Sequence, residues 1–481
     1  MRSRWKRRRM HLVLLSVVAG WRLCFGARAD QPGEPAVEAE EVVCTYVSPD
    51  NGAGPLWCYG APLIVRWQDT VFVSAMETGE GVPKLCNTRW QLFRRDKSGW
   101  HIVQRPEGFR EREPCPLVAF SDGRLFISVN PSVSPPGTQY GPCDPHLLEF
   151  SAKNIEQPPK ILRPVWHRET RFTDHSYRGI ASDGERGEIL LLNIHSQTGD
   201  QHWAFLDRDG KWTRQGKIRF PIRSCYPQVA LRNRGAHVLA IGDIVEPNAE
   251  WRAYKREKTG REWDYIFRRL FYTWTPDIAA TDFAEPLELE NVDSTGGHIR
   301  NLDLWLGPGE SVHVLYLKVP VQSALLRDKF FSEMKMVTSL EYAVLRKGQV
   351  VRREALLKGG EGESAEIPGD AKFHATKDGR LFVIYYCSGR DESGKPISEN
   401  RILQVLPETD AKPVSIPLKN PFTTFFTATE RGGSPASNTI DLFGIGHQPN
   451  TLRYARIRLG PAASAQLRGR RPSQWVRRYG G

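Results

Sequence analysis

The feature that most constrains the fold of this chain is a unit of two β-hairpins that recurs seven times. Each unit has a short apolar strand, a tight turn, a strand rich in β-branched and aromatic residues, and a second hairpin. The units begin near residues 59, 115, 176, 226, 299, 372 and 425. Repetition at intervals of about 50 to 75 residues is typical of propeller blades with inserted loops. We therefore predict an all-β fold, a seven-bladed β-propeller of four-stranded antiparallel blades. The alternative, a two-sheet sandwich, does not require so regular a repeat.

Four Asp-Gly pairs mark the turns within these units, and they begin at residues 122, 183, 209 and 378. Asp-Gly between two apolar runs is a strong hairpin signal, because a two-residue turn needs positive φ at both central positions. Helical periodicity is nearly absent, and residues 320–336 are the one stretch where we expect a short helix.

The two ends of the chain differ in composition from the repeats. Basic residues precede an apolar run at 10–19, and the small residues Ala27 and Ala29 follow it. This order predicts a signal peptide over 1–29 and a secreted or periplasmic protein. The Pro- and Glu-rich stretch 30–43 predicts a linker, residues 44–460 the propeller, and the Arg-rich 461–481 a basic disordered tail.

Net charge excludes one class of partner. The formal charge of +12 falls to +4 without 1–29, which has eight basic and no acidic side chains, and to −1 without the five arginines of 461–481. A nucleic-acid surface needs a basic stripe on the folded body, so we predict no nucleic-acid partner. The apolar run at 10–19 is too short to span a bilayer, so no stable membrane span is expected. We expect a monomer.

Cysteine usage fits an oxidising compartment. Seven cysteines remain after residue 29, so at least one thiol stays unpaired, and Cys44 with Cys58 or Cys115 with Cys143 would close short loops. Their spacing matches no paired metal-ligand motif, and no phosphate-cradling loop or nucleotide fingerprint is present. We therefore predict neither a metal nor a cofactor.

Polar residues near the first strand of each unit are the candidates for a functional site, because inner strands of a propeller converge on one mouth of its axis. Many of these residues are cationic or aromatic. Cations pair with carboxylate or sulfate, and aromatic rings stack on sugar faces, so the pattern favours an anionic polysaccharide as partner. The predicted substrate-binding residues are Tyr177, Arg178, Arg252, His298, Arg300, Asn301 and His374.

The sharpest constellation spans the third and fourth units. His175 precedes a strand, His195 ends the next strand twenty residues later, and Tyr226-Pro227 opens the following unit. This order resembles the BNR-type seven-bladed propellers that include ulvan lyases. The resemblance covers about 80 residues, from His175 to Arg252. Ser176-Tyr177-Arg178 follows the first histidine, where family members generally have a small polar residue and proline.

The resemblance implies β-elimination at a uronic acid. In that reading His175 and His195 bind and polarise the substrate or act as base, Tyr226 is base or acid, and Arg252 neutralises the carboxylate. We thus predict His175, His195 and Tyr226 as catalytic residues. Two alternatives remain open: a sialidase-like glycoside hydrolase, and a propeller that binds a glycan or protein without catalysis.

Overall fold

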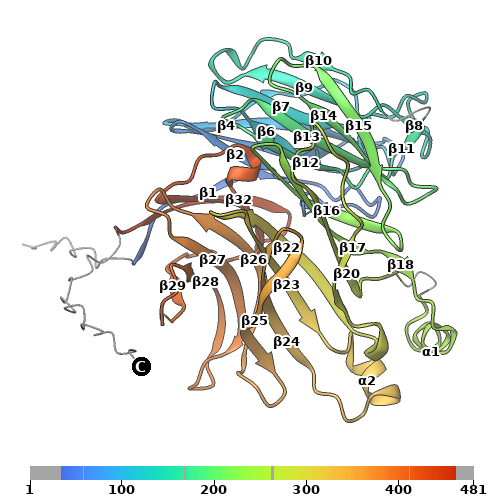
Figure 1. The fold of residues 1–481 in the computed structure, drawn as a ribbon, viewed down its shortest axis with the longest axis vertical. Coiled ribbons are helices and arrows are strands. Elements are labelled where there is room, and N and C mark those ends of the chain that lie inside the picture. Colours follow the sequence, from blue (N-terminus) through green and yellow to red (C-terminus); the bar gives the residue numbers. More distant parts are fainter. Residues whose placement is uncertain (1–33, 58, 167–169, 262–264, 411, 462–481) are drawn as a thin grey trace, which may run out of the picture.

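The fold is a closed ring of seven four-stranded antiparallel sheets, as predicted (Figure 1). A computed structural model describes residues 34–57, 59–166, 170–261, 265–410 and 412–461. Each inner strand contacts the inner strands of both neighbouring blades, and the last contacts the first. The contacts therefore run once around the axis without a break.

The blades are named here in chain order, and each is given from its inner to its outer strand. Blade 1 consists of β2 (Ile64–Trp67), β3 (Thr70–Thr78), β4 (Thr88–Asp96) and β5 (Gly99–Gln104). Blade 2 consists of β6 (Leu117–Ala119), β7 (Arg124–Val129), β9 (His146–Ser151) and β10 (Lys160–Leu162). Blade 3 consists of β12 (Gly179–Asp183), β13 (Glu188–Ile194), β14 (Gln201–Leu206) and β15 (Trp212–Ile218). Blade 4 consists of β16 (Ser224–Arg232), β17 (Gly235–Gly242), β20 (Arg269–Thr275) and β21 (Leu287–Asn291), and blade 5 of β22 (His298–Leu306), β23 (Ser311–Val319), β24 (Val337–Arg346) and β25 (Gln349–Gly360). Blade 6 consists of β26 (Glu366–Ala375), β27 (Leu381–Arg390), β28 (Pro396–Leu406) and β29 (Val414–Ile416). Blade 7 consists of β30 (Phe422–Thr427), β31 (Thr439–Gly446), β32 (Thr451–Leu459) and β1 (Pro35–Thr45).

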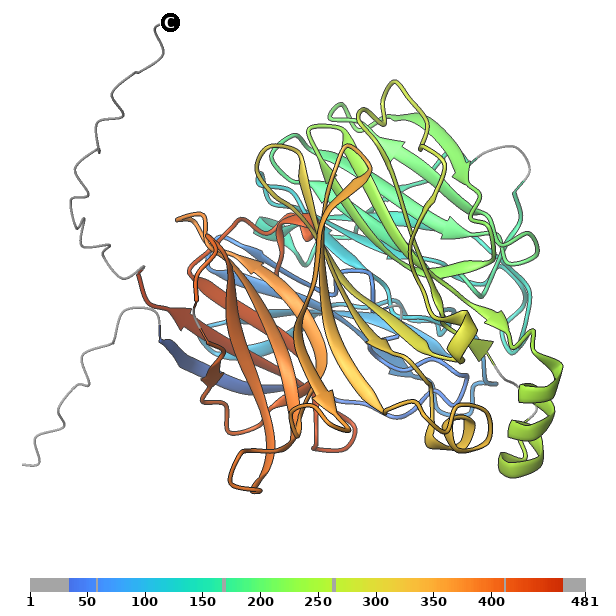
Figure 2. The same cartoon turned by 60° about the horizontal axis from the view of Figure 1, so that its bottom comes forward.

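Blade 7 closes the ring with strands from both ends of the described chain. Strand β1 pairs antiparallel with β32 from Pro35 to Thr45, and Figure 2 shows the two strands side by side. The linker prediction for 30–43 is therefore wrong from Pro35 onward. An outer strand is half-exposed and needs few apolar residues, and its acidic side chains are paired: Glu41 with Arg95 at 2.6 Å and Glu38 with Arg458 at 2.9 Å.

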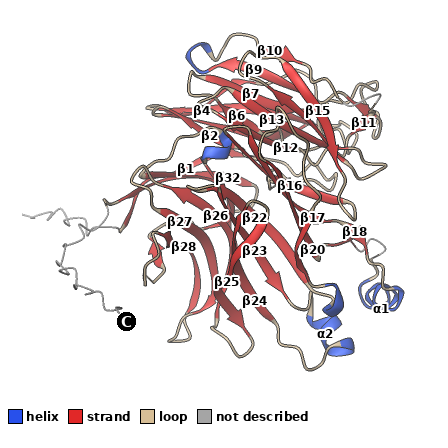
Figure 3. Ribbon diagram, in the orientation of Figure 1, coloured by secondary structure: helices blue, strands red, loops and turns tan. Residues whose placement is uncertain are grey.

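The core is made by the inner and middle strands, which are apolar on both faces. All seven residues of β13 are buried, whereas β15, at the outside of the same blade, alternates between half-buried and exposed positions up to the buried Ile218 at its end. Strands buried on both faces pack against the neighbouring blades, and this packing produces the seven hydrophobic clusters of the ring. Figure 3 shows strands through the whole body, the two α-helices at its margin and one short helical turn beside β2.

The Asp-Gly turns form with a different geometry from the one expected. Gly123, Gly210 and Gly379 have φ of 98°, 71° and 81°, but the aspartates before them do not have positive φ. In the turn that begins at Asp183 the positive φ belongs to Gly187, at 71°. A single left-handed glycine in each loop therefore reverses the chain, which is the geometry of hairpin loops longer than two residues.

Two α-helices lie in insertions between strands. Helix α2 (Ala324–Phe330) falls inside the predicted 320–336. Helix α1 (Ala249–Thr259) was not predicted, although Asn248 caps its start and Gly260, at φ 67°, ends it. The fold also contains two short two-stranded ladders, β8 (Pro142–Cys143) with β11 (Phe172–Thr173) and β18 (Ile244–Val245) with β19 (Tyr265–Ile266). It has three 3-10 turns among the described residues: η1 (Ala152–Asn154), η2 (Asp293–Thr295) and η3 (Glu430–Gly432).

Several predictions about the chain concern residues that the structure does not describe. The signal peptide 1–29 and, from residue 462, the basic tail lie outside the described residues, as does Cys58. The described cysteines are all thiols, so the suggested Cys115–Cys143 disulfide is absent. Within the described part, no helix is long and apolar enough to cross a membrane, and no three His, Cys, Asp or Glu side chains are grouped to hold a metal ion.

Candidate functional site

A cavity of about 860 Å³ opens at the mouth of the axis where the inner strands begin. Its walls come from the segments that lead into blades 1 to 4 and from the β18–β19 ladder. The lining residues are Gly52, Trp57, Arg112, His175, Tyr177, Ser196, Arg223, Tyr226, Asp243, Ile244, Val245, Tyr265 and Phe267. Aromatic rings and two guanidinium groups thus share one hollow.

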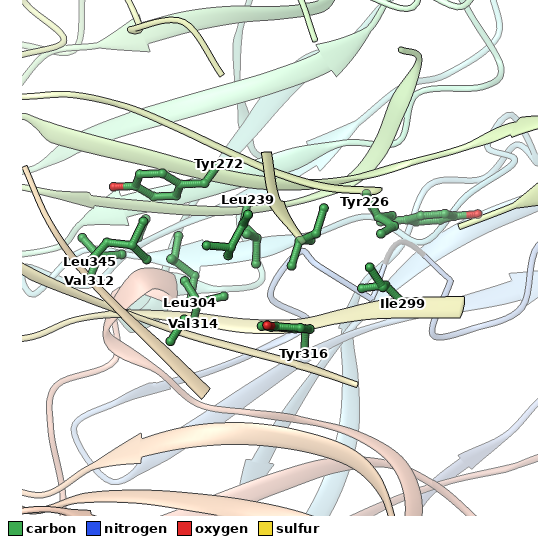
Figure 4. Packing of buried hydrophobic residues seen from close by; sticks show 14 of the residues in the cluster. Tyr226, Leu239, Tyr272, Ile299, Leu304, Val312, Val314, Tyr316 and Leu345 are labelled. Atoms are coloured by element: carbon green, nitrogen blue, oxygen red, sulfur yellow. The ribbon is translucent and has the colours of Figure 1, made fainter. Parts of the chain in front are cut away.

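Aromatic side chains from three blades form the floor of this cavity. The Tyr177 ring stands perpendicular to that of Tyr226, with centroids 5.0 Å apart, and Trp57 meets Tyr177 edge-on at 5.5 Å. Behind them Tyr59 stacks on Tyr226 at 4.9 Å. The indole Nε1 of Trp57 donates to the Tyr226 hydroxyl oxygen at 2.8 Å. Figure 4 shows that hydroxyl directed away from the hydrophobic cluster between blades 4 and 5.

The backbone at the two tyrosines is strained. Tyr177 and Tyr226 have φ of 38° and 51°, in the left-handed region that bulky residues rarely adopt. The pairing of β16 with β17 slips between Cys225 and Gln228, so Tyr226 lies in a β-bulge. Each such residue costs about 1–3 kcal/mol and persists only where its surroundings fix it. The strain directs both phenol rings into the cavity.

Arg112 fixes the protonation state of His175. The Arg112 guanidinium lies 4.5 Å over the Trp57 ring, and its Nη1 is 3.0 Å from His175 Nδ1. Because a guanidinium only donates, Nδ1 accepts, and the neutral imidazole carries its proton on Nε2. Burial and the nearby Arg112 lower the pKa of His175 below its ordinary value. His175 is therefore a neutral donor through Nε2 at physiological pH.

Carboxylates support this arrangement from behind. Glu113 accepts hydrogen bonds from the backbone N–H groups of Ser176 and Tyr177 at 3.1 and 3.0 Å, so it holds the strained segment. Asp174 Oδ2 lies 3.7 Å from both the Nε of Arg112 and the Nε2 of His175. Burial raises the pKa of the Asp174 carboxyl.

The second cation of the cavity is Arg223. Its Nη1 donates to Asp243 Oδ2 at 2.8 Å and to the Asp243 carbonyl at 3.0 Å. The guanidinium carbon lies 5.2 Å from the centre of the Tyr177 ring and 5.9 Å from that of Tyr265. A guanidinium held against aromatic faces is well placed to receive a carboxylate or sulfate.

The structure brings three of the predicted site residues together at the cavity: His175, Tyr177 and Tyr226. Asn301 and Arg300 lie behind its wall, where Asn301 Nδ2 donates to the Tyr226 carbonyl at 2.7 Å and Arg300 lies over the Tyr59 ring at 5.0 Å. Asn301 therefore positions Tyr226 through its backbone.

Five other predicted residues do not line the cavity. His195 points toward the outer strands: its ring centroid is 5.8 Å from that of His202, and its Nδ1 is 3.0 Å from Thr198 Oγ1. The turn that follows β13 directs it there, because His195 N–H donates to the Asp200 carbonyl. Arg252 lies on α1, exposed. The expected pairing of His195 and Arg252 with His175 is therefore not formed.

Arg178, His298 and His374 are structural in this fold. Arg178 is only 1% exposed and donates to the backbone carbonyls of Ser128 and Pro114 at 2.8 Å. His298 packs edge-on against Phe267 at 5.9 Å, and burial lowers its pKa to about 4. His374 lies at the far end of its inner strand, at the opposite mouth of the axis from His175.

The sequence prediction missed Trp57, Arg112 and Arg223. Arg223 directly precedes β16 and Arg112 lies shortly before β6, so both fit the expectation that site residues lie near the first strand of a unit. Trp57 lies in the connection from β1, ahead of the first recognised unit. Glu246 is buried and paired with Arg268 at 2.5 Å, so it serves the fold.

A second cavity, of about 360 Å³, lies at the opposite mouth. Several of its charged groups are bonded within the protein: Glu430 accepts from Trp305 Nε1 at 2.5 Å, and Arg232 donates to the carbonyls of Leu306 and Gly307.

No protein-family model matches this sequence, and no curated protein is significantly similar to it. Solved structures resemble it in part. A protein from Dyadobacter fermentans is 9% identical and covers 89% of this chain and 100% of its own, with a TM-score of 0.42. The GH93 alpha-L-arabinofuranosidase of Fusarium graminearum is 12% identical over 71% of this chain and 93% of its own (TM-score 0.37), and polysaccharide lyase Uly1 is 9% identical over 71% and 89% (TM-score 0.34). Sequence identities and TM-scores this low carry no argument about function, so the function has to be inferred from the residues of the cavity.

Proposed function

We propose that this chain is a secreted carbohydrate-active propeller that holds an acidic sugar of an anionic polysaccharide in the 860 Å³ cavity and cleaves the chain by β-elimination. The observation that carries the proposal is that one cavity holds two guanidinium groups, Arg112 and Arg223, together with His175 and Tyr226. Each guanidinium lies against an aromatic face. Guanidinium forks fit carboxylates, and aromatic faces fit the apolar side of a sugar ring.

Each group then has a role in the elimination. Arg223 neutralises the uronate carboxylate, which makes the adjacent C–H acidic, and the Nε2–H of His175, whose Nδ1 faces Arg112, donates to the same carboxylate. In its phenolate form Tyr226 takes the proton from carbon; the C–C double bond forms as the bond to the leaving glycosidic oxygen breaks, and the Tyr226 phenol then gives that proton to the leaving oxygen. The Trp57 N–H that donates to the Tyr226 oxygen stabilises negative charge there.

The test is incubation of the purified protein with polygalacturonate, alginate and hyaluronan, with neutral arabinan as control. We expect the ultraviolet absorbance of an unsaturated uronate to rise together with the reducing ends on at least one acidic polymer. Reducing ends without that absorbance would instead identify a hydrolase, and binding without cleavage would identify a binding module.

The Tyr226→Phe variant tests the role of the phenol. It removes one hydroxyl and keeps the ring that packs against Tyr59 and Tyr177. We expect kcat to fall about 100-fold or more, with substrate affinity changed only a few-fold. Tyr386→Phe is the matched control, because it also removes a bonded hydroxyl, 2.9 Å from Ser398 Oγ, but far from the cavity in blade 6. Equal kcat in both variants would exclude Tyr226 from proton transfer.

A further inference from the structure

The second cavity, at the mouth of the axis opposite the first, has the size of a small-molecule site. Its volume of about 360 Å³ lies at the lower end of the range of about 300–1,000 Å³ that such sites occupy. Its walls are the ends of the inner strands β12, β16 and β22 and the loop that carries η3, the short turn beside β2 in Figure 1. Leu231, Leu304, Trp305 and Phe373 give these walls an apolar and aromatic surface. None of the described residues that line this cavity lines the first, so the two are separate sites.

One carboxylate of this cavity has no ionic partner. Glu430 is half-buried, and its Oε2 accepts a hydrogen bond from Trp305 Nε1. Among the described residues, no cationic nitrogen lies within 4.0 Å of the Glu430 carboxylate. Burial raises the pKa of Glu430, while the Trp305 hydrogen bond and the more distant Arg232 oppose this shift. A carboxylate that is removed from water without a cation is unfavourable in its charged form.

Glu41 shows how the same arrangement looks when a cation is present. It also accepts from an indole, Trp100 Nε1 at 2.8 Å, but Arg95 donates to both of its oxygens, at 2.6 and 2.8 Å. The hydrogen bond from Arg95 lowers the pKa of Glu41, whereas the pKa of Glu430 is raised. The cation is therefore what Glu430 lacks.

The other charged groups of the second cavity, apart from Glu185, are bonded within the protein. Asp183 accepts backbone N–H groups with both of its oxygens, at 3.1 and 2.7 Å. The three guanidinium groups donate to the Leu306 and Gly307 carbonyls (Arg232), to Glu188 at 3.0 Å (Arg186) and to Asp303 at 3.1 Å (Arg431). Glu185 is exposed at the rim. The charged groups without an ionic partner in the described part of the cavity, Glu430 and Glu185, are thus both acidic.

We propose that the second cavity binds a small organic cation, an amine whose ammonium group pairs with Glu430 and whose apolar body lies against Trp305 and Phe373. The ammonium supplies the charge that the carboxylate lacks, and aromatic rings attract cations. The apolar walls keep water from the pair, which strengthens the attraction. This site goes beyond the proposed function, which depends on the first cavity alone.

The test compares phenethylammonium with its neutral analogue 2-phenylethanol, each titrated into the full chain by calorimetry at pH 7.5. We expect the wild type to bind the cation about tenfold more tightly than the alcohol, because only the cation can pair with Glu430. Glu430→Gln keeps an oxygen for the Trp305 N–H but has no charge, so it should bind the two probes with similar affinity. Glu41→Gln is the matched control, since it also changes a glutamate that accepts from an indole, and it should keep the preference of the wild type.

Three results would overturn the cation site. The first is that the wild type does not bind phenethylammonium, or binds both probes equally well. The second is that Glu430→Gln keeps the preference, and the third is that Glu41→Gln loses it as well. If Glu430→Gln does not fold, Ala436→Phe decides, because it keeps Glu430 and adds a ring at a half-buried position of the cavity wall. Weaker binding of phenethylammonium by this variant supports the site, and unchanged affinity refutes it.

Discussion

His374 should make the protein sensitive to mild acid, although it is far from the cavity. The side chain is 3% exposed, and its Nε2 donates to the Ser437 carbonyl at 2.7 Å, between β26 and the loop after η3. Burial lowers the pKa of His374 from 6.5 to about 4; the Ser437 carbonyl and Asp441 oppose this shift, and Arg66 adds to it. The folded protein therefore holds the imidazole neutral where the unfolded chain would protonate it.

The sign and size of the effect follow from linkage. Above pH 6.5 neither state takes up the proton, so the stability is complete; as the pH falls toward 4 only the unfolded chain binds it, and stability is lost. With pKa values of 6.5 unfolded and about 4 folded, the loss at pH 4.5 is about 2.5 kcal/mol.

The assay is urea unfolding of the wild type and His374→Gln, followed by tryptophan fluorescence at pH 7.5 and 4.5. Glutamine keeps a donor for the Ser437 carbonyl but does not titrate. The free energy of unfolding of the wild type should fall by about 2–3 kcal/mol more than that of the variant between these pH values, because all other groups titrate alike in both. Parallel losses would show that His374 is not held neutral.

Two further changes test the cavity. Gly60→Ala should lower the free energy of unfolding by about 1–3 kcal/mol in chemical unfolding, because a Cβ there would lie 2.7 Å from the Pro227 carbonyl oxygen and 2.8 Å from that of Tyr226. Gly54→Ala is the neutral control, because a Cβ at Gly54 would have no atom within 4 Å. Equal stability of the two variants would refute the close approach at Gly60. Arg223→Gln should raise KM for an acidic polymer about tenfold or more. Arg269→Gln is the control and should leave KM unchanged, because it also breaks an ion pair of an arginine that is 25% exposed, but in the outer part of blade 4. An unchanged KM in both variants would exclude Arg223 from carboxylate binding.

The blade architecture could be predicted because it depends on local signals that recur. Alternating apolar strands and turn glycines mark each hairpin, and seven repetitions outweigh an error in any one. Strand β1 and helix α1 escaped prediction for the same physical reason: neither buries a full apolar face. The backbone bonds of β1 to β32 and the caps of α1 at Asn248 and Gly260 stabilise them instead. Composition alone does not report such bonds.

The site was harder to predict, because side-chain direction depends on local backbone geometry. His175 precedes β12 and His195 directly follows β13, which pairs antiparallel with β12, so both lie at the same mouth of the axis. The turn after β13 nevertheless directs His195 toward His202, whereas the segment before β12 directs His175 into the cavity. His374 and His175 both lie near inner strands, but at opposite ends of them. A sequence gives the strand to which a residue belongs more readily than the end or face on which its side chain lies.

The strained tyrosines explain why the cavity requires the closed ring. Tyr177 is held by Glu113, which comes from the connection into blade 2, and Tyr226 is held by Asn301 of blade 5 and stacked on by Tyr59, which leads into blade 1. Each support comes from a blade other than the one that carries the strained residue. The left-handed conformations cost about 1–3 kcal/mol each and have no local compensation, so a separate blade would relax them. The aromatic floor that presents Arg112, Arg223 and His175 is therefore a product of ring closure.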